Sequence, residues 1–347
     1  MLYKFIFRSI IILFILPLFI NFQVGKRLHD TVILQDSKYI ELGKQWMDVD
    51  NQPINAHGGG FLIHQDTVYW YGEIKQGQTW EPESTKSWNG SRVEAKGINC
   101  YWSVDLIHWK LAGNVLIANE HDSTHDLHTS KVMERPKVIF NEKTGKFVMW
   151  LHIDSQDYSY ARAGVAISDS PRGPFKYSES IRPNGQMSRD QTLFKDDDGT
   201  AYHFYSSEEN MTMHVSKLSD DYLHPSGEYR RIFIDRHREA PAIFKHKGKY
   251  FAITSGCTGW DPNPAEYAVA DDVMGDWKVM GDPCVEDIKG TTFNSQSTYV
   301  LPFNGKYIFM ADRWNRLDLE NSRYVWLPLE IENDLISIRW LDKWNLN

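Results

Sequence analysis

One pattern occurs five times along the chain and constrains its fold more than any other feature. Each copy joins a short β-rich run, through a turn that contains Gly or Asp, to a second run rich in aromatic residues. The copies are GGGFLIHQDTVYWYGE from Gly58, ERPKVIFNEKTGKFVMWLH from Glu134, RDQTLFKDDDGTAYHFYSS from Arg189, REAPAIFKHKGKYFAITSG from Arg238 and SQSTYVLPFNGKYIFMADR from Ser295. The turns Asp198-Gly199, Lys247-Gly248 and Asn304-Gly305 are typical of β-hairpins.

A second pair of β-rich runs follows each copy. These runs lie at 101–110, 165–177, 214–225, 268–279 and 324–341. The chain therefore contains five units of four strands each, and the last four units are spaced by about 50–60 residues. This number and spacing are typical of a five-bladed β-propeller. Helical periodicity is absent after the first residues, which argues against an α/β fold. We therefore predict an all-β, single-domain propeller over residues 40–342 with four antiparallel strands per blade.

Composition limits the possible partners. The 347 residues include 13 Trp, 17 Tyr and 17 Phe, an aromatic fraction of 14%, which is typical of aromatic-rich strands and of sites that stack on sugar rings. The net charge of −8 and the absence of a basic stripe argue against nucleic acid, because phosphate binding needs clustered cations.

The first 25 residues have the layout of a signal peptide. Lys4 and Arg8 precede an apolar run over 10–20, which is shorter than the roughly 20 residues that span a bilayer. An uncleaved N-terminal anchor is the alternative, because no small-x-small cleavage site follows. We expect an exported protein, periplasmic or extracellular. In such a protein the sequence allows two alternatives: a Cys257–Cys284 disulfide, or three unpaired thiols.

The polar residues that open the five units are the first candidates for a site. In a propeller the first strand of every blade lines the central channel, so these residues are expected to converge at one mouth; they are His57, Glu134, Asp190, Glu239 and Gln296. A carboxyl group among apolar strands has a raised pKa, which suits a general acid near neutral pH. Pairing of the glutamates with Arg135 or Arg238 is the structural alternative.

Three further motifs favour simpler interpretations. His57-Gly58-Gly59-Gly60 resembles an oxyanion segment, but no G-x-S-x-G nucleophile motif follows it. The run HDSTHDLHTS over 121–130 is interpreted as a solvated loop, and the aspartates over 196–198 as part of a turn. Tryptophans in polar loops are possible sugar platforms; they are Trp80, Trp88, Trp260 and Trp314.

The chain resembles glycoside hydrolase family 43, and within it the exo-β-1,3-galactanase group. The stretches that carry the resemblance lie between about residue 40 and 342 and include AHGGG with WYGE, VMERPKVIFN, SRDQTLFKDDDGTAYHFYSS, REAPAIFKHKGKYFAITSGCTGWDPNP and NSQSTYV. The resemblance implies that Glu239 is the general acid and that Asp190 orients it and adjusts its pKa. It also implies that Glu134 holds the terminal galactose, with further contacts from Glu73, Tyr158 and Thr258.

One position departs from most of the family. The resemblance implies an Asp in the first blade as general base, but Asn55-Ala56-His57-Gly58 contains no carboxylate. In the galactanase group a glutamine of the fifth blade, matched here by Gln296, is thought to act on the water instead. An amide is a very weak base, so positioning must supply much of its effect. For inversion we expect roughly 6.5–9.5 Å between the acid and the group that activates water.

The predicted activity is the removal of galactose from the non-reducing end of β-1,3-galactan with inversion. We expect a monomer that acts on oligosaccharide or polysaccharide, with no membrane contact beyond the signal segment. No organic cofactor is expected. The sequence leaves undecided whether a structural calcium ion lies in the central channel. The alternatives are another family 43 activity, α-L-arabinofuranosidase or β-xylosidase, and a carbohydrate-binding propeller without catalysis. A protein-interaction propeller is less favoured, because such a surface does not need acids at three strand starts.

Overall fold

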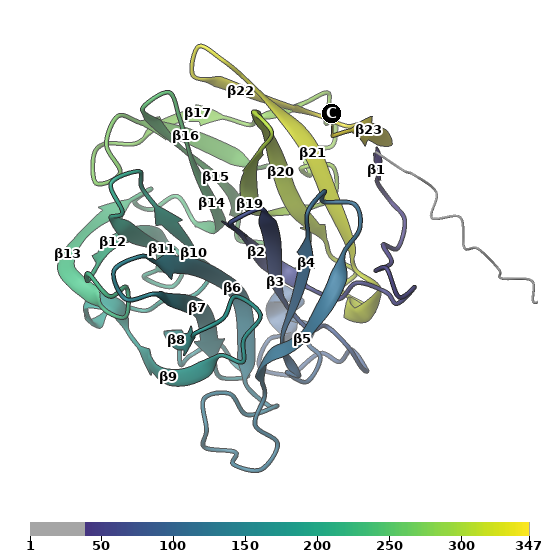
Figure 1. Ribbon diagram of the computed structural model, residues 1–347, viewed down its shortest axis with the longest axis vertical. Helices are drawn as coiled ribbons and strands as arrows, with labels where there is room; N and C mark the ends of the chain where they lie inside the picture. Colours follow the sequence, from purple (N-terminus) through teal and green to yellow (C-terminus); the bar gives the residue numbers. More distant parts are fainter. Residues whose placement is uncertain (1–38, 347) are drawn as a thin grey trace, which may run out of the picture. The chain divides into compact units, whose positions relative to one another are not determined.

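The computed structural model describes residues 39–346, so the signal segment predicted at 1–25 lies outside the described residues. Five β-sheets are arranged around a centre, each a blade of four consecutive antiparallel strands (Figure 1). This arrangement confirms the predicted five-bladed propeller. In the described part of the chain, no helix is long and apolar enough to cross a bilayer.

The first three blades follow one another along the chain. Blade 1 contains β2 (His57–His64), β3 (Thr67–Glu73), β4 (Gly97–Ser103) and β5 (Lys110–Ile117). Blade 2 contains β6 (Val132–Asn141), β7 (Lys146–Asp154), β8 (Arg162–Ser168) and β9 (Lys176–Ile181). Blade 3 contains β10 (Gln191–Lys195), β11 (Ala201–Ser207), β12 (Thr212–Leu218) and β13 (Pro225–Ile232).

The last two blades complete the ring. Blade 4 contains β14 (Arg238–His246), β15 (Lys249–Gly256), β16 (Glu266–Ala270) and β17 (Lys278–Gly281). Blade 5 contains β19 (Gln296–Phe303), β20 (Lys306–Arg313), β21 (Arg323–Glu332) and β22 (Leu335–Arg339), and β18 (Cys284–Val285) adds a parallel strand to β22. The remaining elements are β1 (Tyr39–Glu41), β23 (Lys343–Asn345) and three short 3-10 helices, η1 (Lys86–Trp88), η2 (Pro183–Gly185) and η3 (Leu319–Asn321).

Two kinds of contact close the ring. The first strand of each blade packs on the first strand of the next, and β19 of blade 5 packs on β2 of blade 1. Trp70 of β3 and Trp326 of β21 bring their ring centroids within 5.0 Å between the same two blades, and both side chains are buried. Each fully buried aromatic side chain of this size contributes about 2–3 kcal/mol of hydrophobic stabilisation. Strand β1 also pairs with β23, which joins the two ends of the described chain.

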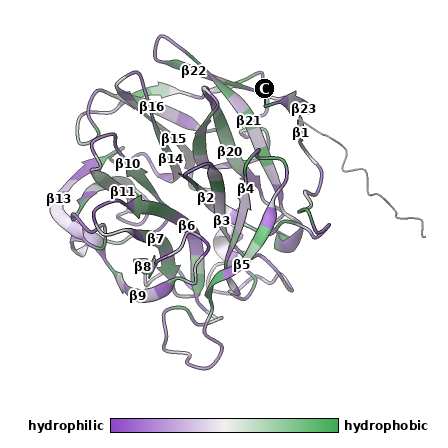
Figure 2. Ribbon diagram, in the orientation of Figure 1, coloured by the Kyte–Doolittle hydropathy of each residue, from purple (hydrophilic) through white to green (hydrophobic). Residues whose placement is uncertain are grey.

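Burial follows the position of a strand within its blade. Strand β7 is almost wholly buried, whereas the outermost strand β13 exposes six consecutive residues and is visibly more hydrophilic (Figure 2). The predicted turns occur where expected: Lys247-Gly248 and Asn304-Gly305 join strands with positive φ at both residues, as type I′ hairpins require. The Asp198-Gly199 turn joins β10 to β11.

Candidate active site

A repeated irregularity at the start of the inner strands aims side chains at the channel mouth. The register of β2, β6 and β14 shifts immediately after His57, Glu134 and Glu239. In each strand the next residue has a left-handed backbone: Gly58 has φ of 56°, Arg135 of 53° and Ala240 of 51°. Bulges of this kind bend a strand and redirect its side chains, and they are frequent next to active sites. For Arg135 and Ala240 this conformation also costs free energy, which a functional position can justify.

The strand starts surround a cavity of about 390 Å³, within the range of small-molecule sites. All five blades contribute to its lining. Eight of the predicted site residues line it: Glu73, Glu134, Tyr158, Asp190, Glu239, Trp260, Gln296 and Trp314.

Two predicted residues do not line the cavity. The His57 ring is 1% exposed; its Nδ1 lies 2.9 Å from Asp312 Oδ1, and the ring stacks on Tyr324. His57 therefore supports the cavity wall from behind and is not placed to contact a sugar directly. Thr258 is exposed, donates to the carbonyl of Asp261 and accepts from Asn263, so it closes its own loop. The predicted sugar contacts of these two residues do not follow from this geometry.

Glu239 has the environment of a carboxylic acid that keeps its proton. Its Oε1 accepts from Gln296 Nε2 at 2.9 Å and its Oε2 from Asn210 Nδ2 at 3.4 Å. Burial raises the pKa of Glu239, and the nearby Asp190 carboxylate raises it further, to about 8. The predicted alternative, a pairing with Arg238, is not formed, because Arg238 donates to Thr254 instead. A carboxyl group in this state can donate a proton at neutral pH.

The amide of Gln296 is hydrogen-bonded on every side. Its Oε1 accepts from Arg135 Nη2 and, at 2.9 Å, from Trp314 Nε1, while its Nε2 donates to Glu239 and Ser255. Guanidinium and indole groups only donate, so they fix the orientation of the amide. The contact with Glu239 also corrects the expected 6.5–9.5 Å separation: nothing lies between the two groups in this structure. A water molecule held by Gln296 needs one of these contacts to open first.

Arg135 joins the acid side of the cavity to the channel. Its guanidinium lies 2.9 Å from Asp190 Oδ2 and also donates to the carbonyl of Ser297. The alternative pairing of Arg135 with Glu134 is therefore not formed. Asp190 and Gln296 both take their orientation from this one buried arginine.

Glu134 has a different environment, because a lysine is its direct partner. Lys75 Nζ lies 2.8 Å from Glu73 Oε2 and 3.2 Å from Glu134 Oε1, and all three side chains are at most 12% exposed. Burial would raise the pKa of Glu134, but the charge of Lys75 outweighs it and the pKa lies well below its usual range. Burial raises the pKa of Glu73; Lys75 opposes this rise and the Glu134 charge adds to it. The two carboxyl groups that share Lys75 therefore differ in the direction of their pKa shifts: the pKa of Glu134 is lowered and that of Glu73 is raised.

Aromatic rings form one wall of the cavity. Trp260 and Trp314 meet edge to face with centroids 4.7 Å apart, and Lys75 Nζ lies 4.9 Å from the Trp260 ring. Trp88 of η1 also lines the cavity, and Trp260 Nε1 donates to the carbonyl of Ser91 at 2.8 Å. The loops of blades 1 and 4 therefore contact each other at the cavity. The predicted sugar platforms Trp88, Trp260 and Trp314 are in place, whereas Trp80 does not line the cavity.

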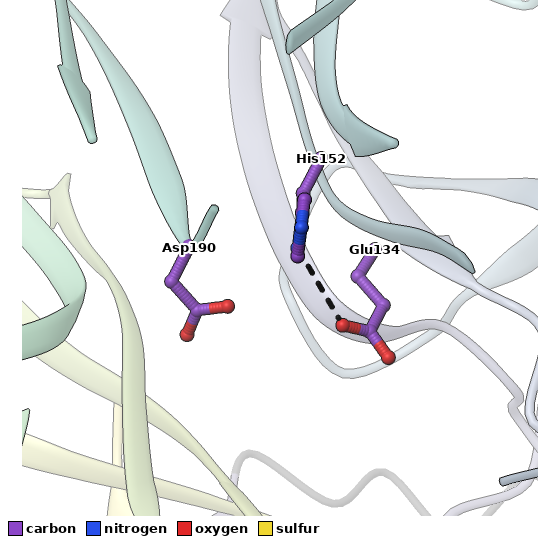
Figure 3. A group of neighbouring side chains, drawn as sticks. All are labelled: Glu134, His152 and Asp190. Atoms are coloured by element: carbon purple, nitrogen blue, oxygen red, sulfur yellow. Dashed lines mark ion pairs between the residues drawn. The ribbon is translucent and has the colours of Figure 1, made fainter. Parts of the chain in front are cut away.

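A calcium ion fits this site poorly. The ligand atoms of Glu134, His152 and Asp190 lie within 4.8 Å of one another and their side chains converge (Figure 3). Calcium takes six to eight oxygen ligands, but this group offers two carboxylates and a nitrogen. Both carboxylates already have cationic partners, Lys75 and Arg135.

The three cysteines are unpaired, so the possible Cys257–Cys284 bridge is not formed.

Several contributors to the site are not predicted from the sequence, among them Asn210, Lys75, Arg135 and His152. Lys75 lies two residues after Glu73 in the segment GEIK, and its charge next to a candidate carboxylate was the available signal. Arg135 was considered only as a partner of Glu134. His152 gave no signal, because a histidine inside an apolar strand is more often a core residue than a cavity residue.

The comparisons with known proteins agree with this geometry. The family model described as glycosyl hydrolases family 43 matches residues 83–296. A solved family 43 β-1,3-galactosidase, bound to galactodeoxynojirimycin, is 43% identical; the match covers 88% of this chain and 100% of that chain with a TM-score of 0.81. An exo-β-1,3-galactanase from Phanerochaete chrysosporium, solved with β-1,3-galactotriose, is 36% identical over 90% of this chain and 69% of that chain, with a TM-score of 0.80.

A curated relative has another specificity. A xylosidase/arabinosidase of Bacteroides ovatus is 25% identical over 273 residues, 67% of this chain and 79% of that protein. The family match therefore extends across enzymes that act on different sugars. The fold, the cavity and these matches together show that the chain belongs to glycosyl hydrolase family 43.

Proposed function

We propose that this protein is an exo-acting galactan 1,3-β-galactosidase that releases galactose from the non-reducing end of β-1,3-galactan with inversion. The observation that carries the mechanism is Glu239, a carboxyl group whose pKa is raised to about 8 in a cavity built from all five blades. The sugar specificity rests on the relatives: 43% and 36% identity to a β-1,3-galactosidase and an exo-β-1,3-galactanase, against 25% to the xylosidase/arabinosidase.

In the proposed reaction, Glu239 gives its proton to the glycosidic oxygen while the bond from that oxygen to the anomeric carbon breaks. A water oxygen attacks the anomeric carbon from the opposite face and releases a proton to solvent, which balances the proton that Glu239 later takes back from solvent, so α-galactose and a shortened chain are formed. Glu239 regains a proton before the next turnover. Burial, followed by the Asp190 charge, keeps the pKa of Glu239 raised.

Gln296 is the proposed holder of the attacking water. Because its amide contacts Glu239 directly, the incoming sugar has to separate the two groups. Arg135 and Trp314 then keep the amide oriented. Glu134 accepts hydroxyl groups of the terminal galactose as an ionised carboxylate. The layout of residues 1–25 supports export, which suits an enzyme that acts on a polysaccharide.

The test is to incubate the purified protein with linear β-1,3-galactan and follow the anomeric protons by NMR from the first minutes. We expect α-galactose as the first and only small product. Arabinose or xylose release from the matching substrates, without galactose, would favour the other family 43 activity. Binding to galactan without release would instead favour the non-catalytic carbohydrate-binding propeller.

A further inference from the structure

His152 lines the cavity and has a buried ring nitrogen that no protein group satisfies. The residue lies on β7, its side chain is 1% exposed, and it is among the residues that line the cavity. Its Nε2 lies 2.9 Å from Asp154 Oδ2. Its Nδ1 has no hydrogen-bond partner. Buried polar side-chain atoms nearly always have a partner, so an unsatisfied atom at a cavity indicates that a ligand supplies it.

The nearest groups cannot satisfy this nitrogen themselves. Glu134 Oε2 lies 3.7 Å from Nδ1, which is beyond hydrogen-bond distance. The Asp190 carboxylate lies within 4.8 Å of the same group of atoms. Figure 3 shows the His152 ring directed into the space between the two carboxylates. A ligand atom in that space can reach Nδ1 and a carboxylate oxygen together.

The charges around this space favour a neutral ligand group over a cation. Glu134 is already paired with Lys75, and Asp190 with Arg135. A divalent cation would add two positive charges to a cluster whose charges are balanced. Because Nε2 donates to Asp154, Nδ1 of the neutral ring is an acceptor, so a neutral hydroxyl group can donate its hydrogen to Nδ1 while a neighbouring hydroxyl donates to a carboxylate. A sugar ring supplies such hydroxyl groups side by side.

We propose that His152 Nδ1 binds a hydroxyl group of the sugar that occupies the cavity, which makes His152 a specificity-determining residue. This inference rests on the proposed function, because it takes the terminal galactose as that sugar. Asp154 is a positioning residue: it holds Nε2, and its other oxygen accepts from the backbone of Ser155 and Ala161. Asp154 thereby fixes both the ring and the start of the loop that carries Tyr158.

Two substitutions of His152 separate ligand binding from structural support. An asparagine amide occupies the position of Nδ1, so His152→Asn keeps a polar group at the cavity and loses the contact with Asp154. A glutamine amide occupies the position of Nε2, so His152→Gln keeps Asp154 satisfied and removes the cavity-facing group. His203→Gln is the matched control, because His203 is fully buried on β11 with both ring nitrogens unpartnered and does not line the cavity.

The measurement is kcat/KM for β-1,3-galactobiose and for analogues that each lack one hydroxyl group on the non-reducing unit. In the parent enzyme, loss of the hydroxyl that His152 binds is expected to cost about tenfold or more, the value of one good hydrogen bond. His152→Gln should be about tenfold slower on the full substrate and should no longer distinguish that one analogue. His152→Asn and His203→Gln should still distinguish it.

Other results would overturn the inference. The inference is wrong if His152→Gln discriminates every analogue as the parent does. It is also wrong if His152→Asn loses activity while His152→Gln behaves as the parent, because the role of His152 is then structural. Activity that is lost with a chelator and restored by calcium or magnesium in the parent, but not in His152→Gln, would identify a cation site instead. A parent that releases no galactose contradicts the proposed function, and calorimetry with galactose and its deoxy analogues then applies the same comparison to binding alone.

Discussion

Glu134 and Glu239 lie near the start of equivalent strands of blades 2 and 4, immediately before the same kind of bulge, and line the same cavity, yet they differ in ionisation. Glu134 has Lys75 as a direct partner and accepts a hydrogen bond from Tyr158, and its pKa lies well below its usual range. Glu239 accepts from the amides of Gln296 and Asn210 and contacts the Cys257 thiol, and burial raises its pKa to about 8. The repeat supplies two equal positions, and the neighbouring side chains make one of them a binding carboxylate and the other an acid.

The largest effect is expected from removing the proton of Glu239. Glu239→Gln keeps the size of the side chain and one of its two acceptor oxygens but has no acidic proton, so kcat on β-1,3-galactan should fall by about 10³-fold or more. Galactose binding, measured by calorimetry, should change little. Glu142→Gln is the control, because the Glu142 side chain is 62% exposed in the β6–β7 turn, at the other end of this hairpin from Glu134, and does not line the cavity. More than a tenth of the parental kcat in Glu239→Gln would mean that Glu239 is not the acid.

A cation next to Glu239 should convert it toward the state of Glu134. Asn210→Lys replaces an amide that donates to Glu239 Oε2 with an ammonium group, which favours the ionised carboxylate and lowers the pKa of Glu239 by about 1–3 units. At pH 7, kcat/KM should then fall by about 2–100-fold, and the alkaline limb of its pH profile should move to lower pH. Asn210→Met is the uncharged control. An unmoved alkaline limb would show that Glu239 does not set it.

Removal of the lysine next to Glu134 is the converse experiment. Lys75→Met leaves a buried carboxylate without its partner, so the pKa of Glu134 should rise and the KM for galactan should increase by about tenfold, with a smaller change in kcat. The free energy of unfolding should fall by about 3 kcal/mol, as for other buried pairs that lose one member. The exposed pair of Lys143 and Asp220 provides the control, because Lys143→Met should cost less than about 1 kcal/mol. An unchanged KM in Lys75→Met would separate Glu134 from sugar binding.

The sequence predicted the propeller well because its signals are local. Hairpin turns such as Asn304-Gly305 and alternating aromatic strands repeat at a regular spacing, and each copy constrains the others. The strand-opening residues were predictable for the same reason, since position within the repeat brings Glu134, Asp190, Glu239 and Gln296 to one cavity.

The ionisation states were not predictable, because they depend on contacts between segments far apart in the chain. Lys75 reaches Glu134 across 59 residues, and Arg135 reaches Gln296 across 161. The bulges after Glu134 and Glu239 place non-glycine residues at positive φ, which no turn motif announces. His57 opens its unit like the others, but Asp312 and Tyr324 hold it behind the wall.

The smallest expected effect is a pH-dependent difference in stability, and it separates the two glutamates without any substrate. Burial, followed by the Asp190 charge, raises the pKa of Glu239 from its ordinary value of 4.5 to about 8, so the folded protein binds more protons than the unfolded chain between these values. Stability from this group is therefore complete below pH 4.5 and is lost as the pH rises through about 8. Glu239→Gln cannot ionise, so its melting temperature should exceed that of the parent above pH 8, and the gap should close below pH 4.5.

Glu134→Gln should behave in the opposite way in the same scan. Its carboxylate is ionised and paired with Lys75 in the folded state, so the substitution removes a stabilising partner and lowers the melting temperature at neutral pH. Glu73 has a raised pKa in the parent and in Glu239→Gln alike, so its contribution cancels in that comparison. Differential scanning calorimetry from pH 4 to 9 measures both variants, and a Glu239→Gln curve that runs parallel to the parent would show that this carboxyl group titrates as an ordinary glutamate.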